Sequence, residues 1–380
     1  MQKNNIFISA GEASGDLHAA NLVKEIKSTN PEIKFFGMGG SLMRESGVEI
    51  LFDFTRLAIV GGTEILFHFK KILRAMSIAK QFLKNNPPNL VILIDYPGFN
   101  LWLAQKAKKL NIKVLYYISP QVWAWHKSRI HRIKKYVDFM AVVLPFEVAL
   151  YEKAGIPAAF VGHPLLKVVH PTMDIHEAKK CFNIKEDDKV VGLFPGSRIA
   201  EIKRLLPSML QTAELLQNKY PNIQFIIPLA SSLQENDLEP YLIDTNLNIN
   251  IVKNKNYDVI SICDAIIATS GTVTLEIALL AVPMVIVYKM SSINYFFAKR
   301  LVKIPFIGLC NIIANEKIVE ELIQNEASAK NIFSAIDKIL QNENYRMEMI
   351  GKLQQIKSKL ASVEQKNIKD IVLQLMLEKK

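Results

Sequence analysis

The chain has 380 residues, which corresponds to two domains of ordinary size. Half of the residues are apolar and 22% are charged, so the composition supports packed cores and excludes a largely disordered protein. Lys and Arg number 47 against 36 Asp and Glu, and this surplus favours anionic partners such as phosphorylated ligands or lipid headgroups.

Cysteine usage and hydropathy exclude further classes. The three cysteines are scattered, which argues against a disulfide framework or a thiolate metal site and fits a reducing compartment. We find no signal peptide and no uncharged apolar stretch of about 18–20 residues. The protein is therefore expected not to span a membrane, although it can lie against one.

Short apolar runs alternate with helical patterns along the chain. The first half contains predicted strands at Ile6–Ser9, Val91–Ile94, Val114–Ile118 and Phe139–Val143, with helices at 17–28 and 99–110. The second half contains predicted strands at Val190–Phe194, Ile223–Pro228, Ile249–Val252, Ala265–Ala268 and Met284–Tyr288, with helices at 200–220 and 272–280. This alternation predicts an α/β fold of two Rossmann-like doubly wound domains that face each other across a cleft.

The alternation of predicted strands and helices is interrupted near residues 162–173, a segment that contains Pro164 and Pro171. We therefore place the first domain at 1–168 and the second at 169–345. The remaining segment, 346–380, is amphipathic, and its helices are expected to pack back on the first domain or on a partner subunit.

Two glycine turns follow predicted strands, where doubly wound sheets bind ligands. Gly11–Asp16 is either a helix N-terminus that attracts a phosphate or polar ligand, or a tight turn with Asp16 near the N-cap. It lacks the G-x-G-x-x-G spacing, so a dinucleotide is not favoured. Pro195–Arg198 carries an Arg that can grip a diphosphate, or a surface Arg on a turn.

Polar residues follow two further strands. In Ser270–Glu276, Ser270 or Thr272 could cap the next helix, and Glu276 could accept hydrogen bonds from a ribose or favour the positive helix end. Because Glu276 stands in an apolar run, where an unpaired carboxylate is costly, a ligand role gains weight. Asp95 is a candidate general base or a turn-forming residue before Pro97.

Aromatic, apolar and basic residues gather in three segments. Ser119–Trp125 precedes a basic run that suits a phosphosugar, a headgroup or a nucleic acid, or forms a solvated helix face. The stripe of residues 65–76 is either core packing or a basic amphipathic helix at a membrane interface. Tyr295–Ile304 is a second such candidate. We see no H-E-x-x-H, D-x-D or His/Cys cluster for a metal.

Together these motifs resemble those of the lipid-A-disaccharide synthase family. The resemblance is carried in the family's order by Gly11–Asp16, Ile118–Trp125, Leu144–Glu147, Phe194–Arg198, Ser270–Glu276 and Ala298–Lys303. It implies a B-type glycosyltransferase (GT-B) fold and an inverting hexosyltransferase without a cofactor or metal. The implied reaction transfers 2,3-diacylglucosamine from UDP-2,3-diacylglucosamine to 2,3-diacylglucosamine 1-phosphate, which gives UDP and the β-1,6 disaccharide 1-phosphate of lipid A.

The resemblance also implies roles for single residues. Asp95 would deprotonate the acceptor 6-hydroxyl. Contacts to the donor nucleotide would come from Gly196, Ser197, Arg198, Ser270, Gly271, Thr272, Glu276 and Asn311. The substrate cleft would be lined by Glu12, Ser14, Gly15, Gln121 and Trp123. Acyl chains and membrane phospholipids would be faced by Ile65, Leu66, Phe69, Ile72 and Leu73.

The implied setting is the cytoplasmic face of a Gram-negative inner membrane, with a peripheral protein that forms a homodimer by exchanging C-terminal segments. Lys289 and Cys310 depart from the family pattern, which has Arg and Pro there. Two alternatives remain open: another UDP-sugar enzyme of this fold, such as a peptidoglycan-type N-acetylglucosaminyltransferase or a 2-epimerase, and a non-catalytic lipid or nucleotide binder. A nucleic-acid partner is not expected, because no recognition motif supports one.

Overall fold

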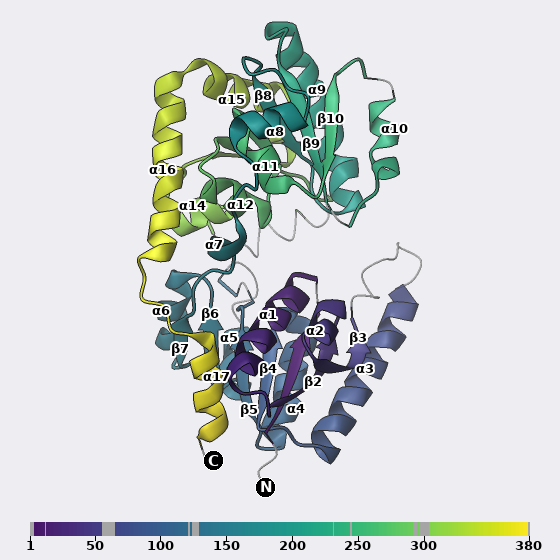
Figure 1. Ribbon diagram of the computed structural model, residues 1–380, viewed down its shortest axis with the longest axis vertical. Coiled ribbons are helices and arrows are strands. Elements are labelled where there is room, and N and C mark those ends of the chain that lie inside the picture. The colour runs from purple at the N-terminus through teal and green to yellow at the C-terminus, as the bar shows by residue number, and fades with distance from the viewer. Residues whose placement is uncertain are drawn as a thin grey trace. The chain divides into compact units, whose positions relative to one another are not determined.

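The computed structural model describes residues 4–11, 13–54, 65–120, 122–123, 129–230, 232–243, 245–291, 295 and 304–378, and for 13 and 65–69 it describes the backbone. The chain forms two compact units and passes between them twice. Unit 1 combines Met1–Pro164 with Val363–Lys380, and unit 2 consists of Leu165–Ser362 (Figure 1).

Unit 1 is built on a seven-stranded parallel sheet in the order β3-β2-β1-β4-β5-β6-β7. Its strands are β1 (Asn5–Ala10), β2 (Lys34–Gly39), β3 (Val48–Asp53), β4 (Leu90–Ile94), β5 (Lys113–Tyr117), β6 (Phe139–Val142) and β7 (Ala158–Phe160). Its helices are α1 (Ala13–Thr29), α2 (Ser41–Glu45), α3 (Ile65–Asn85), α4 (Pro97–Lys109), α5 (Arg129–Tyr136), α6 (Pro145–Lys153) and α17 (Ile368–Leu377). Strands β1 and β4 are buried along their whole length, as expected for a parallel sheet covered on both faces.

Unit 2 repeats this plan with a six-stranded parallel sheet in the order β10-β9-β8-β11-β12-β13. Its strands are β8 (Val190–Phe194), β9 (Gln224–Leu229), β10 (Ile249–Lys253), β11 (Ala265–Thr269), β12 (Met284–Tyr288) and β13 (Glu320–Ile323). Its α-helices are α7 (Leu165–Val168), α8 (Ile175–Cys181), α9 (Ile199–Lys219), α10 (Glu239–Leu242), α11 (Asn256–Ser261), α12 (Val273–Leu279), α14 (Leu309–Ala314), α15 (Ala329–Gln341) and α16 (Glu343–Ala361).

The direction in which strands are added reverses once in each sheet. In unit 1 the chain goes outward to β3 and then returns to pair β4 with β1, with Ala10 opposite Ile94. In unit 2 the corresponding return pairs β11 with β8. Open α/β sheets bind ligands outside the carboxyl ends of the strands at such a switch point. The loops after β1, β4, β8 and β11 are therefore the places where function is expected.

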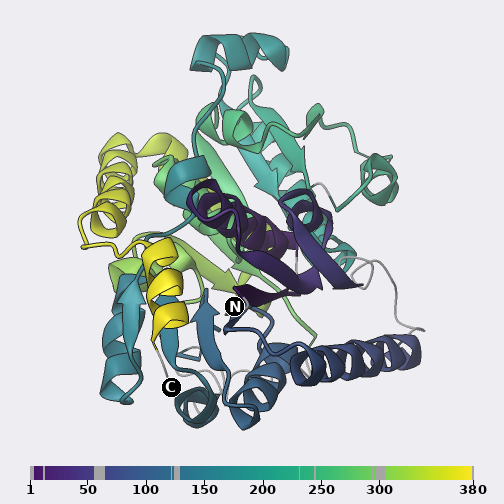
Figure 2. The same ribbon diagram turned by 60° about the horizontal axis from the view of Figure 1, so that its bottom comes forward.

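The C-terminal segment is divided between the units, which differs from the predicted division. Helix α16 packs on α12, α14 and α15 of unit 2, whereas α17 packs on α1, β4 and β5 of unit 1 (Figure 2). Two contacts fix the break between these helices: the Lys366 N–H donates to the Phe160 carbonyl at 2.9 Å, and Asn367 caps α17. The first crossing between the units lies after Pro164 rather than after residue 168.

Helices α3, α4 and α5 are successive neighbours in unit 1, and they concentrate the positive charge of the chain. Five basic residues occur in α3, three in α4 and four in α5, with no acidic residue in any of them. These twelve cations exceed the net charge of the whole chain, +11, by one. The exposed ones are Lys70, Lys71, Arg74, Lys80, Lys84, Lys109, Arg132, Lys134 and Lys135. Within the described ranges, no helix is both long enough and apolar enough to cross a bilayer.

Candidate functional site

The turn after β1 fits closely against the turn after β4. A Cβ atom at Gly11 would lie 2.3 Å from the Tyr96 ring, so no larger residue fits there without displacing that ring. Gly15 is buried in the first turn of α1 against Ala10 and Ile94. Ser14 is exposed beside it, and Glu12 lies outside the described residues. The predicted Gly11–Asp16 motif therefore stands at the switch point of unit 1.

Asp16 has a structural role at a different helix from the one expected. The sequence suggested a place near the N-cap of α1, but the side chain bonds to α2. Its buried carboxylate accepts hydrogen bonds from the N–H groups of Gly40 at 2.6 Å, Leu42 at 3.0 Å and Met43 at 3.3 Å. These donors belong to the start of α2, not of α1, so Asp16 satisfies the free N–H groups of the neighbouring helix.

Asp95 lies directly after β4 in an unusual backbone conformation. Both Asp95 and Tyr96 have positive φ angles, 47° and 44°, although neither is glycine. Such conformations cost on the order of 1–3 kcal/mol each, and they cluster at functional sites where the surroundings enforce them. A buried network enforces this one: Asn100 donates to the carbonyls of Ile94 at 3.0 Å and Asp95 at 2.7 Å, and Ser9 holds the Asn100 amide oxygen.

Tyr116 of β5 holds the same turn from the other side. Its hydroxyl donates to the Asp95 carbonyl at 2.6 Å. Burial, followed by the charge of Asp95, raises the pKa of Tyr116 well above its ordinary value, so the hydroxyl keeps the proton that it donates. The Asp95 backbone is thus fixed by β4, α4 and β5 together, and the side chain of this partly exposed residue starts from a defined position.

The segment after β5 is also strained and tied down. Ile118 has a φ of 61°, which is rare for a β-branched residue. Ser119 and the Trp123 indole both donate to the Glu147 carboxylate, at 2.8 Å and 3.0 Å. Trp123 is half-buried with its ring edge against Phe146. Gln121 lies outside the described residues, and the contact between Glu147 and this segment was not predicted.

In unit 2, the turn after β8 places Gly196, Ser197 and Arg198 at the start of α9. Gly196 has a φ of 111°, which side chains rarely adopt. Glu201 organises the turn: it accepts a hydrogen bond from the Ser197 N–H at 3.1 Å and pairs with the exposed Arg198 at 3.0 Å. The guanidinium is therefore available to solvent at the switch point, held by a carboxylate that sequence reasoning missed.

The turn after β11 differs in detail from the prediction. Neither Ser270 nor Thr272 caps α12 with its side chain; the Ser270 hydroxyl donates to the Ile307 carbonyl at 3.0 Å. Gly271 and Thr272 are exposed. The Glu276 carboxylate is hydrogen-bonded to the Tyr257 hydroxyl, and burial raises the pKa of Glu276.

Tyr257 responds to the same contact from α11. Burial, and after it the charge of Glu276, raises the pKa of Tyr257 to about 12, so its hydroxyl stays a donor. The position of Glu276 in the sequence predicted a carboxylate near this turn. It did not indicate that Tyr257 would be its hydrogen-bond partner.

Asn311 is predicted, like the residues above, to contact the donor nucleotide, but it does not reach the surface. It is fully buried, and its amide accepts from the N–H groups of Ile318 and Val319 and donates to the Val319 carbonyl and to Glu321. Glu321 in turn accepts from the N–H groups of Ile307 and Gly308. Asn311 therefore holds the 307–321 loop, and a direct contact with a ligand would require it to break these bonds.

The predicted acyl-facing stripe is described in part. The side chains of Ile65, Leu66 and Phe69 lie outside the described residues. Ile72 is half-buried, whereas Leu73 is 48% exposed. The buried face of α3 consists of Ala75, Ala79 and Leu83, so core packing accounts for that side of the helix. It does not account for the exposed Leu73. The second apolar segment is described only at Tyr295 and Ile304.

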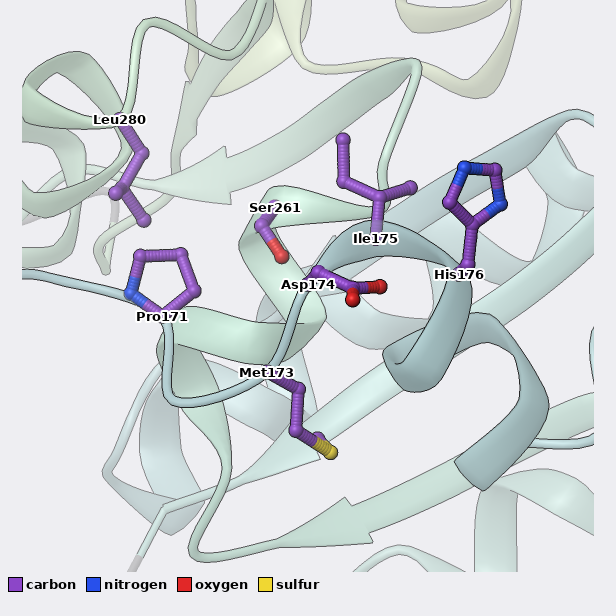
Figure 3. A pocket seen from close by; sticks show the side chains of 7 residues that line it. All are labelled: Pro171, Met173, Asp174, Ile175, His176, Ser261 and Leu280. Carbon is purple, nitrogen blue, oxygen red and sulfur yellow. The ribbon is translucent and has the colours of Figure 1, made fainter.

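One pocket of unit 2 is separate from these motifs. A pocket of about 540 Å³ is lined by Pro171, Met173, Asp174, Ile175, His176, Ser261 and Leu280 (Figure 3). Asp174 already caps α8 and His176 pairs with Glu186, so the polar groups of this pocket are engaged. No residue predicted to bind substrate lines it.

Of the two departures from the family pattern, Lys289 has a hydrogen-bond partner and Cys310 is buried. Lys289 donates to the Ser208 hydroxyl at 2.6 Å, and burial lowers its pKa. Cys310 is buried in α14. Across the described parts of the chain, no group of three or more His, Cys, Asp and Glu residues could hold a metal ion.

Similar solved structures establish the fold. A UDP-GlcNAc 2-epimerase from Neisseria meningitidis superposes with a TM-score of 0.64 at 13% identity, covering 98% of this chain and 99% of that one. Acinetobacter baumannii MurG superposes with a TM-score of 0.55 at 14% identity, covering 98% and 99%. The two parallel-sheet domains therefore have the GT-B fold of glycosyltransferases and related epimerases.

Sequence comparison identifies the family within this class. The family model for lipid-A-disaccharide synthetase matches residues 6–375. A lipid-A-disaccharide synthase of Geobacter sulfurreducens is 51% identical over 359 residues, which are 94% of each chain, and one of Coxiella burnetii is 46% identical over 95% of each. The chain belongs to the lipid-A-disaccharide synthase family of glycosyltransferases, as its motifs predicted.

Proposed function

We propose that this protein transfers 2,3-diacylglucosamine from UDP-2,3-diacylglucosamine to 2,3-diacylglucosamine 1-phosphate, with inversion, to form the β-1,6 disaccharide 1-phosphate of lipid A and UDP. The observation that carries the proposal is family membership over residues 6–375, a range that includes the polar turns at both switch points. The same membership argues against the alternatives of an epimerase and of a non-catalytic binder.

On the acceptor side, Asp95 is proposed as the general base. As the acceptor 6-hydroxyl attacks the anomeric carbon, its proton passes to the Asp95 carboxylate, while the bond from that carbon to the UDP oxygen breaks. The buried bonds of Asn100 and Tyr116 to the Asp95 carbonyl support this role, because they fix the backbone from which the carboxylate reaches the substrate.

On the donor side, the charge that develops on the departing UDP needs stabilisation. Arg198 can offer two parallel hydrogen bonds to a diphosphate, and the exposed N–H groups near Gly271 and Thr272 can offer more. Glu276 is proposed to accept from the ribose hydroxyls in exchange for its bond to Tyr257. Asn311 is proposed to act indirectly, by holding the loop that contacts Ser270.

A direct assay tests the reaction. The purified protein, mixed with both diacylated substrates in the presence of EDTA, is expected to form the tetraacyl disaccharide 1-phosphate, detected by mass spectrometry. Product under these conditions would establish the transfer and its independence from free divalent metal. A folded protein that binds UDP but yields no product would contradict the proposed function.

Replacement of Asp95 tests the general base. Asp95→Asn keeps the shape of the side chain but removes its basicity, so kcat should fall by about 10²- to 10⁴-fold while UDP affinity changes little. Asp53→Asn, at the end of β3 in the same sheet, is the matched control and should keep its activity. A wild-type rate for Asp95→Asn would rule out this assignment.

Replacement of Glu276 tests the ribose contact. Glu276→Ala should weaken UDP binding about 10- to 100-fold in calorimetry, because hydrogen bonds to a charged group contribute about 1.5–3 kcal/mol. Glu214→Ala, an exposed carboxylate on α9, serves as the control. Unchanged UDP affinity in Glu276→Ala would mean that the carboxylate serves only its bond to Tyr257.

We also propose that unit 1 lies against the anionic cytoplasmic face of the inner membrane, as a peripheral protein. The support is that the neighbouring helices α3, α4 and α5 carry basic residues and no acidic residue, and that Leu73 on α3 is exposed. Diacylated substrates reside in that membrane, so such a surface would bring the enzyme to them. A homodimer with exchanged C-terminal segments remains a prediction.

Charge reversal tests this surface. Lys71→Glu with Arg74→Glu should weaken binding to phosphatidylglycerol vesicles by about 10- to 30-fold, since each Lys or Arg near an anionic surface contributes about 1 kcal/mol. Lys330→Glu with Lys357→Glu removes the same charge from unit 2 and should bind nearly as the wild type does. Equal losses in both pairs would contradict a specific surface, and sedimentation at several salt concentrations measures them.

A further inference from the structure

Glu147 is a buried carboxyl group to which the proposed reaction assigns no role. It is 1% exposed and lies in the first turn of α6. One oxygen, Oε2, accepts the Leu144 N–H at 3.3 Å, which is a local helix-capping contact. The other, Oε1, accepts from Ser119 and Trp123, which lie more than 20 residues away in the segment after β5. Capping therefore accounts for only one of its two oxygens.

The protons of this cluster can be counted. The Ser119 hydroxyl has one proton, yet it lies 2.8 Å from Glu147 Oε1, 2.8 Å from the Tyr151 hydroxyl and 3.0 Å from the Pro120 carbonyl. With Glu147 ionised, Tyr151 donates to Ser119 and Ser119 donates to Glu147. With Glu147 protonated, its O–H donates to Ser119, and Ser119 then donates to the Pro120 carbonyl. The two protonation states thus place different hydrogen bonds on the segment.

The segment that this cluster holds begins beside the proposed base. Strand β4 pairs with β5 so that Ile94 lies opposite Tyr117, and the next residues along the two strands are Asp95 and Ile118. Both have positive φ angles, 47° and 61°. The chain therefore adopts costly conformations at two neighbouring strand ends. Glu147 supplies the buried hydrogen-bond acceptor for the segment that follows the second end.

We propose that Glu147 is a positioning residue for the transfer reaction, in which its ionised carboxyl fixes Ser119 and Trp123 and thereby the segment that borders Asp95. The inference rests on the proposed function and extends it, because Glu147 touches neither the substrate nor the reacting atoms. An apolar residue would fill the same space without the cost of a buried carboxylate, but it would leave the Trp123 N–H and the Ser119 hydroxyl without this acceptor.

The electrostatic surroundings make this positioning sensitive to pH. Burial raises the pKa of Glu147 from 4.5 to about 7, and the hydrogen bonds from Ser119, Trp123 and Leu144 oppose that rise. Among the described residues, Tyr151 of α6 is the titratable group that bonds Ser119 and interacts with Glu147; next to it, Tyr116 of β5 interacts in turn with Asp95, Tyr151 and Arg129. Burial raises the pKa of both tyrosines, so Glu147 is the member of this cluster that changes charge near neutral pH.

Glu147→Gln tests the proposal, because glutamine keeps the shape of the side chain and imitates the protonated form at every pH. We expect kcat to fall about 10- to 100-fold, as for a misplaced reacting group, with little change in KM for the UDP donor. In the wild type, kcat should rise with pH through about 7 as Glu147 ionises, and the variant should lack this rise. Glu152→Gln, an exposed carboxylate on the same helix, is the matched control.

The pH dependence of folding stability tests whether the titrating group is Glu147. Because the folded protein holds this proton more tightly than the unfolded chain does, wild-type stability should decrease as pH rises from 4.5 to about 7. Glu147→Gln should lack that decrease. If it does not fold, Ser119→Ala removes the same hydrogen bond with a smaller change and is expected to lower kcat in the same way, and a wild-type kcat for Ser119→Ala would overturn the proposal.

The outcomes separate this inference from the function on which it rests. No product from the wild type would overturn the proposed function and the inference together. An active wild type with an unimpaired Glu147→Gln would overturn the inference alone. A reduced kcat that keeps the wild-type rise through pH 7 would also overturn it, because the carboxyl would then be structural and the titration would belong to another group.

Discussion

The pairing of β1 with β4, and of β8 with β11, is the constraint on which the proposed base and most of the proposed donor contacts depend. These are the points where each sheet reverses its order of strand addition, so the loops that leave the paired strands turn to opposite faces. Gly11 and Asp95 follow one pair, and Arg198 and Gly271 follow the other. Residues about 80 positions apart in the chain are thus brought together by the pairing of the strands that precede them.

Side chains behind the switch points then fix the loop conformations. In unit 1, Asn100, Tyr116 and Glu147 act from α4, β5 and α6 on the turns that carry Asp95 and Trp123. In unit 2, Glu201, Tyr257 and Glu321 do the same for the turns after β8 and β11 and for the 307–321 loop. Asn100, Tyr116 and Glu147 hold the strained turns, and Glu321 bonds N–H groups of the 307–321 loop, so losing one of them would leave a buried or partly buried polar atom without that partner.

The sequence predicted strands such as β4, β8 and β11, and the turns that follow them, because both depend on local pattern: these strands are largely apolar runs, and Gly196 marks a turn by its own backbone preference. It did not predict β2, β3, β7 or β13, which complete the two sheets. It did not predict the network, because Glu147 and Tyr257 look like ordinary helix residues until folding brings their distant partners near. Asn311 shows the converse case: its motif position suggested a ligand contact, whereas the structure buries its amide in bonds to the 307–321 loop. The break before α17 was missed because it depends on a bond to Phe160, about 200 residues earlier.

Unit 1 draws on both ends of the chain, and this affects the order in which the protein can be assembled during synthesis. All of Leu165–Ser362 has been translated before the ribosome reaches α17, so unit 2 has its complete sequence while unit 1 still lacks a helix. Until α17 arrives, the surfaces of α1, β4 and β5 that it covers remain open to water or to other apolar chains. The strand that precedes Asp95 is therefore covered only after α17 has been translated, and a nascent chain that stalls before α17 would expose apolar surface behind its own proposed catalytic base.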